Sequence, residues 1–142
     1  MDVSEIIPGR LWMGAEMDLF TWNWAAQQGI TAVVAVQDEY PDPAPPGRAG
    51  IVMLWAPTPD IPSGPLDPAW LQDTVAMAEY LYRSGRKLYI HCIAGVSRSA
   101  TVTVALLMRL EGLPFETAFQ RVRACRGINP YEPYMALLRA FK

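Results

Sequence analysis

The residues with the clearest chemical potential in this chain lie at positions 91–99, with the sequence His-Cys-Ile-Ala-Gly-Val-Ser-Arg-Ser. Cys92 can act as a nucleophile once it ionises, and backbone N–H groups together with the cation of Arg98 favour its thiolate. The planar guanidinium of Arg98 also matches two oxygens of a phosphoryl group. Ser99 could donate to the thiolate and stabilise the same sulfur as a leaving group, while His91 is expected to orient the loop through a backbone hydrogen bond. These residue types predict attack of Cys92 on phosphorus.

The residues that follow Cys92 are predicted to form an anion-binding loop. At the start of a helix, the first backbone N–H groups have no partner, and together with the helix dipole they attract anions. Gly95 permits a positive φ where the loop turns tightly around its ligand. We expect phosphate or another oxyanion to be bound by Ile93, Ala94, Gly95, Val96, Ser97 and Arg98. No metal and no cofactor are expected.

Cleavage of a phosphate ester also needs an acid that protonates the departing oxygen. The only histidine is His91, so a carboxylic acid is expected in this role. Asp60 is the preferred candidate, because the proline-rich segment 57–62 follows a predicted strand and would lie over the same end of the sheet. Once ionised, Asp60 would take a proton from the water that attacks phosphorus. Asp67 is better explained as the N-cap of a helix that begins at Pro68.

The apolar pattern and the positions of Gly and Pro predict the elements that hold this loop. The predicted strands are a brief edge strand within 9–14, two buried strands at 30–36 and 51–55, and a short strand at 87–91. The predicted helices are 18–28, 68–83, 97–110, 114–125 and a last piece after Pro133. A proline-rich exposed loop is expected at 40–50. This order predicts one α/β domain over residues 1–142, with a central, mostly parallel sheet flanked by helices. In such sheets, ligands bind where loops follow the carboxyl ends of strands.

Composition narrows the class of protein. The chain has 12 Lys and Arg against 14 Asp and Glu, so no strong field draws it to nucleic acid or to an anionic membrane, and neither partner is expected. No apolar run reaches the ~18 residues that would span a bilayer, and the N-terminus lacks the apolar region of a secretory signal. Cys92 and Cys125 show no paired spacing, which indicates free thiols and a cytoplasmic location. Cys125 is interpreted as a packing residue rather than as a redox partner for Cys92.

The loop at 91–99 resembles the signature loop of the protein tyrosine phosphatase family, in the version of its dual-specificity branch. The matching residues are His91, Cys92, Gly95, Arg98 and Ser99. Further similarity to that branch lies in segments 7–14, 29–31 and 126–134, so the resemblance covers nearly the whole chain, about a minimal catalytic core. The resemblance implies a phosphorylated protein or peptide as substrate. It also implies four roles: Cys92 is the nucleophile, Arg98 the phosphate ligand, Ser99 the thiolate partner and Asp60 the general acid.

The chain departs from this family in two places. Many members have an asparagine in the closing segment that supports the loop, whereas Tyr131 falls at that place here and Asn129 lies two residues earlier. The sequence assigns a role to neither. The long N-terminal extension of the tyrosine-specific members, with its phosphotyrosine-gripping loop, has no room in this chain. A shallower pocket is therefore expected.

Other functions for the same residues form three groups. The chain could be a catalytically weak phosphate-binding module, another thiol enzyme such as a sulfurtransferase or an arsenate reductase, or a phosphatase of a phosphoinositide, a phospholipid or an RNA 5′ end. The combination of Cys92, Arg98 and an acid favours a phosphatase.

The loop residues also bear on the substrate. Family members that act on inositol phosphates carry lysines in the loop, whereas this chain has Ile93, Ala94 and Val96 there. We therefore expect phosphotyrosine to be hydrolysed best, phosphoserine and phosphothreonine more slowly, and inositides poorly.

Overall fold

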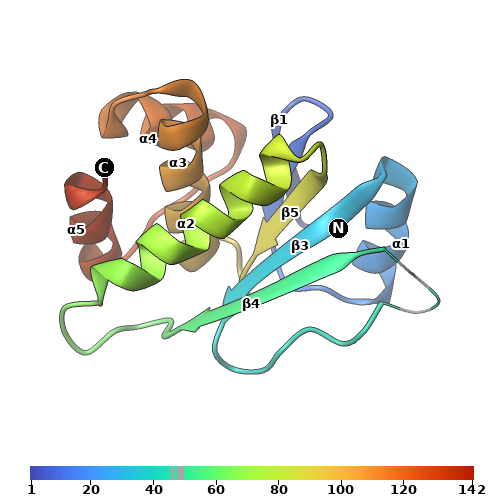
Figure 1. Cartoon of the computed structure of the whole chain (residues 1–142). Coiled ribbons are helices and arrows are strands. Elements are labelled where there is room, and N and C mark those ends of the chain that lie inside the picture. Colours follow the sequence, from blue (N-terminus) through green and yellow to red (C-terminus); the bar gives the residue numbers. More distant parts are fainter. Residues whose placement is uncertain (46, 48–49) are drawn as a thin grey trace.

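A five-stranded sheet forms the centre of the computed structural model, which describes residues 1–45, 47 and 50–142 (Figure 1). Its strands are β1 (Val3–Ile7), β2 (Leu11–Gly14), β3 (Ile30–Gln37), β4 (Val52–Thr58) and β5 (Lys87–His91). They lie in the order β1-β2-β5-β3-β4, with β1 antiparallel to β2 and every other neighbouring pair parallel. The predicted α/β domain with a mostly parallel sheet is confirmed.

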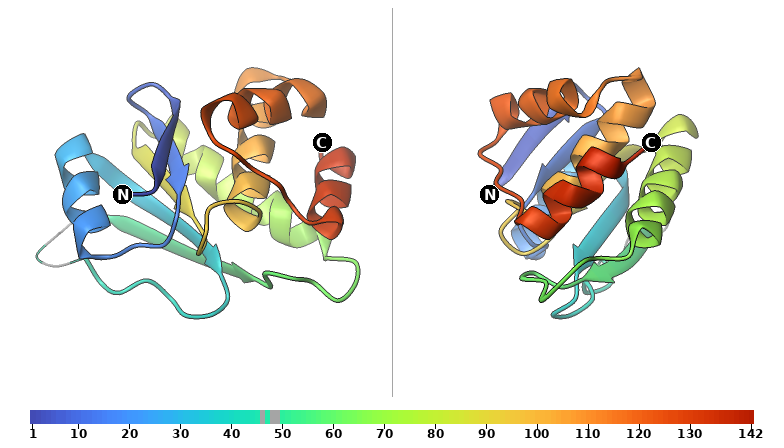
Figure 2. Two further views of the ribbon diagram at one scale, coloured as in Figure 1. Left: turned by 180° about the vertical axis from the view of Figure 1, so that it is seen from behind. Right: turned by 90° about the vertical axis from the view of Figure 1, so that its left-hand side faces the viewer.

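Helices cover both faces of this sheet. They are α1 (Leu19–Gln28), α2 (Pro68–Arg83), α3 (Arg98–Glu111), α4 (Phe115–Cys125) and α5 (Glu132–Ala140), close to the predicted ranges. One face carries α1, and the other carries the remaining four (Figure 2). Local capping explains several boundaries. The Asp18 carboxylate accepts the N–H of Thr21 at 2.8 Å before α1, and Asp67 accepts the N–H of Ala69 at 2.9 Å, which confirms Asp67 as an N-cap.

Two strand predictions are wrong. The strand within 9–14 was expected at the edge, but β2 lies between β1 and β5. The edge strand β1 was not predicted, because Ser4 and Glu5 interrupt its apolar pattern. The strand at 51–55 was expected to be buried, but β4 is the other edge of the sheet. Its side chains alternate between the two faces, and on one of them Met53 is 37% and Trp55 45% exposed.

Outside the core, some of the expectations from the sequence are confirmed and one is wrong. The described residues of 40–50 form no helix or strand, as predicted, and residues 46, 48 and 49 of that loop lie outside the described residues. Both cysteines are free thiols, but Cys125 is exposed at the end of α4, so its predicted packing role is wrong. Nowhere in the described ranges is a helix both long enough and apolar enough to cross a bilayer.

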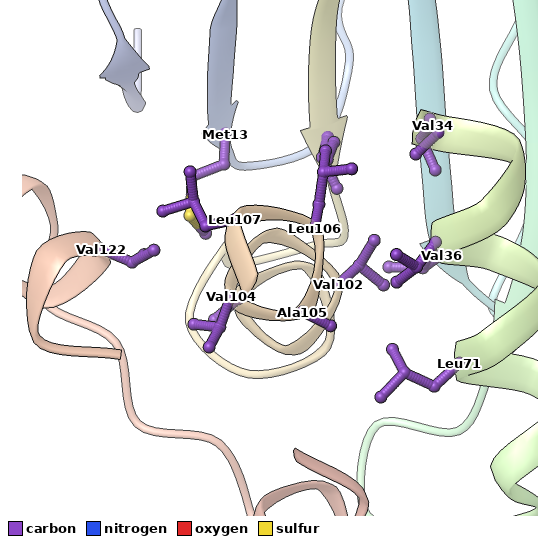
Figure 3. Close-up of a cluster of buried hydrophobic side chains, with 14 of the residues drawn as sticks. Met13, Val34, Val36, Leu71, Val102, Val104, Ala105, Leu106, Leu107 and Val122 are labelled. Carbon is purple, nitrogen blue, oxygen red and sulfur yellow. The ribbon is translucent and has the colours of Figure 1, made fainter. Parts of the chain in front are cut away.

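The main core lies between the sheet and helices α2 to α5, with α3 at its centre. Figure 3 shows buried side chains of α3, among them Val102 and Leu106, between those of the sheet and those of α2. A second, smaller cluster joins the opposite face of the sheet to α1 through residues such as Trp22 and Tyr89. Because β5 and the first turns of α3 are buried, both ends of the loop that joins them are fixed.

Candidate active site

The loop of residues 92–97 lies in the middle of the carboxyl edge of the sheet. His91, the last residue of β5, pairs with Gly14 of β2 on one side and Ala35 of β3 on the other. Arg98 then begins α3. Figure 2 shows this loop, in yellow to orange, near the carboxyl end of β3. The structure thus places the loop between a buried strand and a helix N-terminus, as the sequence predicts.

Donors outside the loop hold its acceptors in place. Three of these donors are backbone N–H groups: Glu16 donates to the Ile93 carbonyl at 3.0 Å, Asn129 to the Val96 carbonyl at 2.9 Å, and Tyr131 to Ser97 Oγ at 3.2 Å. In a trans peptide the N–H points opposite to the C=O. Carbonyl groups that point out of the loop therefore leave the neighbouring N–H groups pointing into it. Asn129 and Tyr131 thus both support the loop, through their backbones.

Arg126 supplies the other outside donors, and sequence reasoning missed it. Its Nε donates to the Gly95 carbonyl at 2.7 Å, and its Nη2 donates to the Ala94 carbonyl at 3.0 Å. Its Nη1 reaches Asp2 Oδ1 at 2.8 Å, which links the loop to the segment before β1. The one available signal was its place in the closing segment that resembles the family.

Gly95 is required by the geometry of the turn. Its φ is +69°, in the left-handed region that favours glycine, as predicted. A Cβ at this position would lie 2.5 Å from both the carbonyl carbon and the oxygen of Gly14. The loop therefore turns against β2 with no room for a side chain.

Cys92 lines a pocket of about 320 Å³. Its Sγ is 3.3 Å from the backbone N of Gly95, which donates to it, and 3.2 Å from Ser99 Oγ. Its side chain is buried. The pocket is lined by Asp60, Cys92, Ala94, Val96, Ser97, Asn129 and Tyr131. The sulfur therefore has the partners that the sequence predicted for it, in a site open to a ligand.

Asp60 belongs to this pocket, whereas Asp67 does not. The Asp60 side chain is 54% exposed, and its Oδ1 lies 3.6 Å from Nε of Arg98. The chain leading to it is anchored by the buried hydroxyl of Tyr134, which bonds the Pro59 carbonyl and lies 2.8 Å from Thr58 Oγ1. Burial raises the pKa of Tyr134 to about 12, so this hydroxyl keeps its proton. The structure thus brings together Cys92, Arg98 and the predicted acid.

Arg98 is held by a residue that the sequence did not single out. Its side chain is buried, and it makes a two-point ion pair with Glu39, from Nη1 to Oε1 at 2.7 Å and from Nη2 to Oε2 at 2.9 Å. Nη1 also donates to the Thr58 carbonyl at 3.1 Å. The hydrogen-bonded guanidinium lowers the pKa of Glu39 to about 2. No pattern in the sequence marks Glu39.

His91 connects the loop to the same acidic segment. Its Nδ1 lies 3.0 Å from the Cys92 carbonyl oxygen, the kind of backbone contact that was predicted. Its Nε2 lies 2.7 Å from Asp42 Oδ2, and both side chains are buried. Asp42 was expected in an exposed loop, so its buried side chain is a correction. The cause is the histidine beneath it, which gives the carboxylate a partner inside the protein.

Comparison with known proteins identifies the family. The family model described as "Dual specificity phosphatase, catalytic domain" matches residues 11–142. The chain belongs to this family. It is 34% identical over 122 residues to the dual specificity protein phosphatase 12 of Rattus norvegicus. The matched residues are 86% of this chain and 35% of that protein. The chain therefore spans about a third of the length of that relative.

Other relatives resemble the chain in sequence and in structure. Human dual specificity phosphatase 28 is 37% identical over 108 residues, which is 76% of this chain and 59% of that protein. The crystal structure of human DUSP28 has a TM-score of 0.86 at 30% identity and covers 99% of this chain and 93% of that one. A mouse putative dual specificity phosphatase, solved in complex with zinc tungstate, also has a TM-score of 0.86 at 30% identity. That match covers 99% of this chain and 86% of the mouse chain.

The pair of Glu39 with Arg98 predicts how stability depends on pH. The ordinary pKa of Glu39 is 4.5, and in the folded chain it is about 2. The stabilising contribution of the ionised carboxylate is therefore fully present above pH 4.5 and is lost as the pH falls to about 2. Urea denaturation across this range is expected to show the free energies of unfolding of the wild type and Glu39→Gln converging as the pH falls.

A second carboxylate variant provides the control. Glu132 pairs with Arg139 at the surface, where both side chains are more than half exposed, and Glu132→Gln removes a charge of the same sign. The difference in the free energy of unfolding between Glu132→Gln and the wild type is expected to change less over the same pH range. An equal pH dependence for the two variants would contradict the special role of the buried guanidinium.

Proposed function

We propose that the chain is a cysteine-dependent phosphatase that hydrolyses phosphotyrosine, and more slowly phosphoserine and phosphothreonine, on proteins. The observation that carries this proposal is Cys92, whose sulfur lies in a loop of inward-facing N–H groups, in a pocket that Asp60 also lines. Membership of the dual specificity phosphatase family supports it. So does the mouse relative crystallised with zinc tungstate, because tungstate is a tetrahedral oxyanion like phosphate.

The first chemical step forms a phosphocysteine. The Cys92 thiolate attacks phosphorus, the S–P bond forms, and the bond from phosphorus to the leaving oxygen breaks. Asp60 gives its proton to that oxygen. The N–H groups of the loop and the guanidinium of Arg98 bind the other phosphoryl oxygens, on which negative charge is spread in the transition state.

The second step returns the free enzyme. A water molecule attacks phosphorus, the ionised Asp60 takes its proton, and the S–P bond breaks with its electron pair returning to sulfur. Ser99 Oγ, 3.2 Å from Sγ, can donate to the departing thiolate. Inorganic phosphate is then released. The chain's own side chains account for each proton transfer.

The lining of the pocket favours a protein substrate with a single aromatic phosphate ester. Ala94, Val96 and Tyr131 form apolar and aromatic walls, and the loop has no lysine for a second phosphate. Tyr131 is 45% exposed, which supports a contact between its ring and that of a phosphotyrosine. A cytoplasmic location remains part of this proposal, on the ground of the free thiols.

Replacement of the proposed nucleophile tests the mechanism directly. Cys92→Ser is expected to abolish turnover on a panel of phosphotyrosyl, phosphothreonyl, lipid and nucleotide substrates, because an un-ionised hydroxyl cannot replace the thiolate. Phosphate binding should persist, since the loop and Arg98 remain. Cys125→Ser alters the other, exposed thiol and should keep full activity. Turnover by Cys92→Ser above a trace would rule out the covalent mechanism.

Replacement of Asp60 tests the proposed acid. Asp60→Asn is expected to lower kcat about 10²–10⁴-fold for an ester with a poor leaving group, which needs a proton. An activated aryl phosphate, whose leaving group departs unprotonated, should be affected much less. Asp67→Asn is the matched control, since it makes the same change of side chain at a residue outside the pocket and asparagine is an equally good helix N-cap. If only Asp67→Asn shows the leaving-group dependence, the acid is Asp67.

The substrate preference predicts a specific effect at Tyr131. Peptides of one sequence carrying phosphotyrosine or phosphothreonine, and a phosphoinositide, would be compared by kcat/KM at one pH and salt concentration. Tyr131→Ala is expected to lower kcat/KM for phosphotyrosine about 2- to 13-fold, the value of an aromatic contact of about 0.5–1.5 kcal/mol. The kcat/KM for the phosphothreonine peptide should change less. Tyr80→Ala, in an exposed tyrosine on α2, is the control. A preference for the inositide would refute the proposed substrate class.

A further inference from the structure

Asp60 is held in place by its backbone and not by partners of its carboxylate. Within the described residues this carboxylate accepts no hydrogen bond, and Nε of Arg98, 3.6 Å from Oδ1, is too far away to donate one. The chain that follows gives little support, because none of residues 61–67 is buried. The position of the carboxylate is therefore set by the residues that precede it.

The hydroxyl of Tyr134, on α5, bonds the two residues before Asp60. It bonds the Pro59 carbonyl and lies 2.8 Å from Thr58 Oγ1. A carbonyl can only accept, so the single proton of the phenol goes to Pro59, and the Thr58 hydroxyl donates to the phenol oxygen. The Pro59 carbonyl and the nitrogen of Asp60 belong to one planar peptide group. The bond to Tyr134 therefore fixes the plane from which Asp60 projects.

Tyr134 is itself firmly held. Its side chain is completely buried, and its ring packs edge-on against Trp70 of α2, with the ring centroids 5.9 Å apart. The indole N–H of Trp70 donates in turn to the Ala56 carbonyl of β4 at 2.9 Å. The end of β4, α2 and α5 thus form one packed unit. Through Tyr134, the exposed Asp60 is connected to the core of the protein.

The hydroxyl of this tyrosine needs an explanation that its ring does not. The burial of the ring and its contact with Trp70 require only an aromatic side chain, which phenylalanine would also provide. A buried hydroxyl costs free energy unless it is hydrogen-bonded. Both of its partners lie in the two residues that lead to Asp60. The polar part of Tyr134 is therefore directed at the segment that carries the acid.

We propose that Tyr134 is a positioning residue for proton transfer, whose hydroxyl holds the backbone before Asp60 so that the carboxyl faces the leaving oxygen. This inference rests on the proposed function of the pocket. Tyr134 is not among the residues that line the pocket, so it acts through Asp60. Thr58 adds a link to the phosphate ligand, because its carbonyl accepts from Arg98 Nη1 at 3.1 Å. The acid and the phosphate ligand are thus held by one short segment, which fixes their relative geometry.

The substitution Tyr134→Phe tests the proposal, because it removes the hydroxyl and keeps the ring. It is expected to lower kcat about tenfold for an ester with a poor leaving group, less than loss of the acid itself, since the contacts of Arg98 and Trp70 remain. For an activated aryl phosphate, the loss should be less than about twofold. The affinity for inorganic phosphate, measured by calorimetry in the Cys92→Ser background, should not change.

A double-mutant cycle with Asp60→Asn separates positioning from a general loss of structure. If Tyr134 acts through Asp60, Tyr134→Phe should have little further effect on kcat once Asp60 has been replaced. Thermal unfolding of each variant would establish that the protein is folded. If Tyr134→Phe does not fold, Thr58→Val serves instead. It removes the other hydroxyl of the pair, and a smaller loss with the same leaving-group dependence is expected.

Tyr89→Phe is the matched control. It also removes a buried tyrosine hydroxyl that bonds a backbone carbonyl, in this case that of Ala15. Ala15 belongs to the segment before α1 and not to the segment that carries Asp60. Any loss of kcat in this variant is therefore expected to be the same for the two substrates.

Each outcome decides between definite alternatives. Equal losses on the two substrates, no loss on either, or an undiminished loss in the Asp60→Asn background would overturn the positioning role. Weaker phosphate binding would also overturn it, because the hydroxyl would then act on Arg98. If the wild type turns over no substrate, the proposed function fails and the inference with it. If the wild type and Asp60→Asn behave as expected but Tyr134→Phe shows no leaving-group dependence, only the inference fails.

Discussion

The anion site depends on one constraint, which is that the carbonyl oxygens of the loop at 92–97 are bonded to donors outside it. A peptide group cannot turn its N–H inward without turning its C=O outward, where the oxygen needs a partner. Arg126 and the backbone N–H groups of Glu16 and Asn129 supply those partners. The positive φ of Gly95 lets the chain make the turn. The N–H groups near Cys92 are therefore in place before any ligand arrives.

The same constraint explains why so much of the chain surrounds a short loop. The donors come from the segments that precede α1 and α5, and Asp2 in turn orients Arg126. On the opposite side, Glu39 and Asp42 hold Arg98 and His91 from the segment after β3. The sheet brings these segments together, because β2, β3 and β5 are parallel neighbours whose carboxyl ends lie at one edge. The core thus serves mainly to fix the places from which these contacts are made.

The parts of the site that are contiguous in sequence could be predicted. The strand, loop and helix around Cys92 follow from apolar patterning and from glycine, and the helix caps from Asp and Pro. Asp60 could be predicted because it follows a strand that ends at the same edge. In each case a local pattern carried the information. Long-range contacts had no part in these predictions.

The remaining contacts could not be predicted, for two physical reasons. Glu39, Asp42 and Arg126 join residues that are tens of positions apart, and a charged residue in a loop has no local mark that reveals its partner. Asn129 and Tyr131 act on the loop through backbone N–H groups, which every residue except proline provides. Side-chain identity at these two positions is therefore no guide to their contribution. For the same reason, an asparagine is not needed there to hold the loop.

The two-point pair of Glu39 with Arg98 also affects how a substrate approaches the site. The positive charge of the arginine is balanced by a carboxylate within hydrogen-bond distance, and the chain as a whole has a net charge of −2. Long-range electrostatic steering, which can accelerate encounters when a cleft carries excess charge of one sign, is therefore weak here. Discrimination takes place after contact, when the direction of the N–H groups decides which collisions lead to a bound complex.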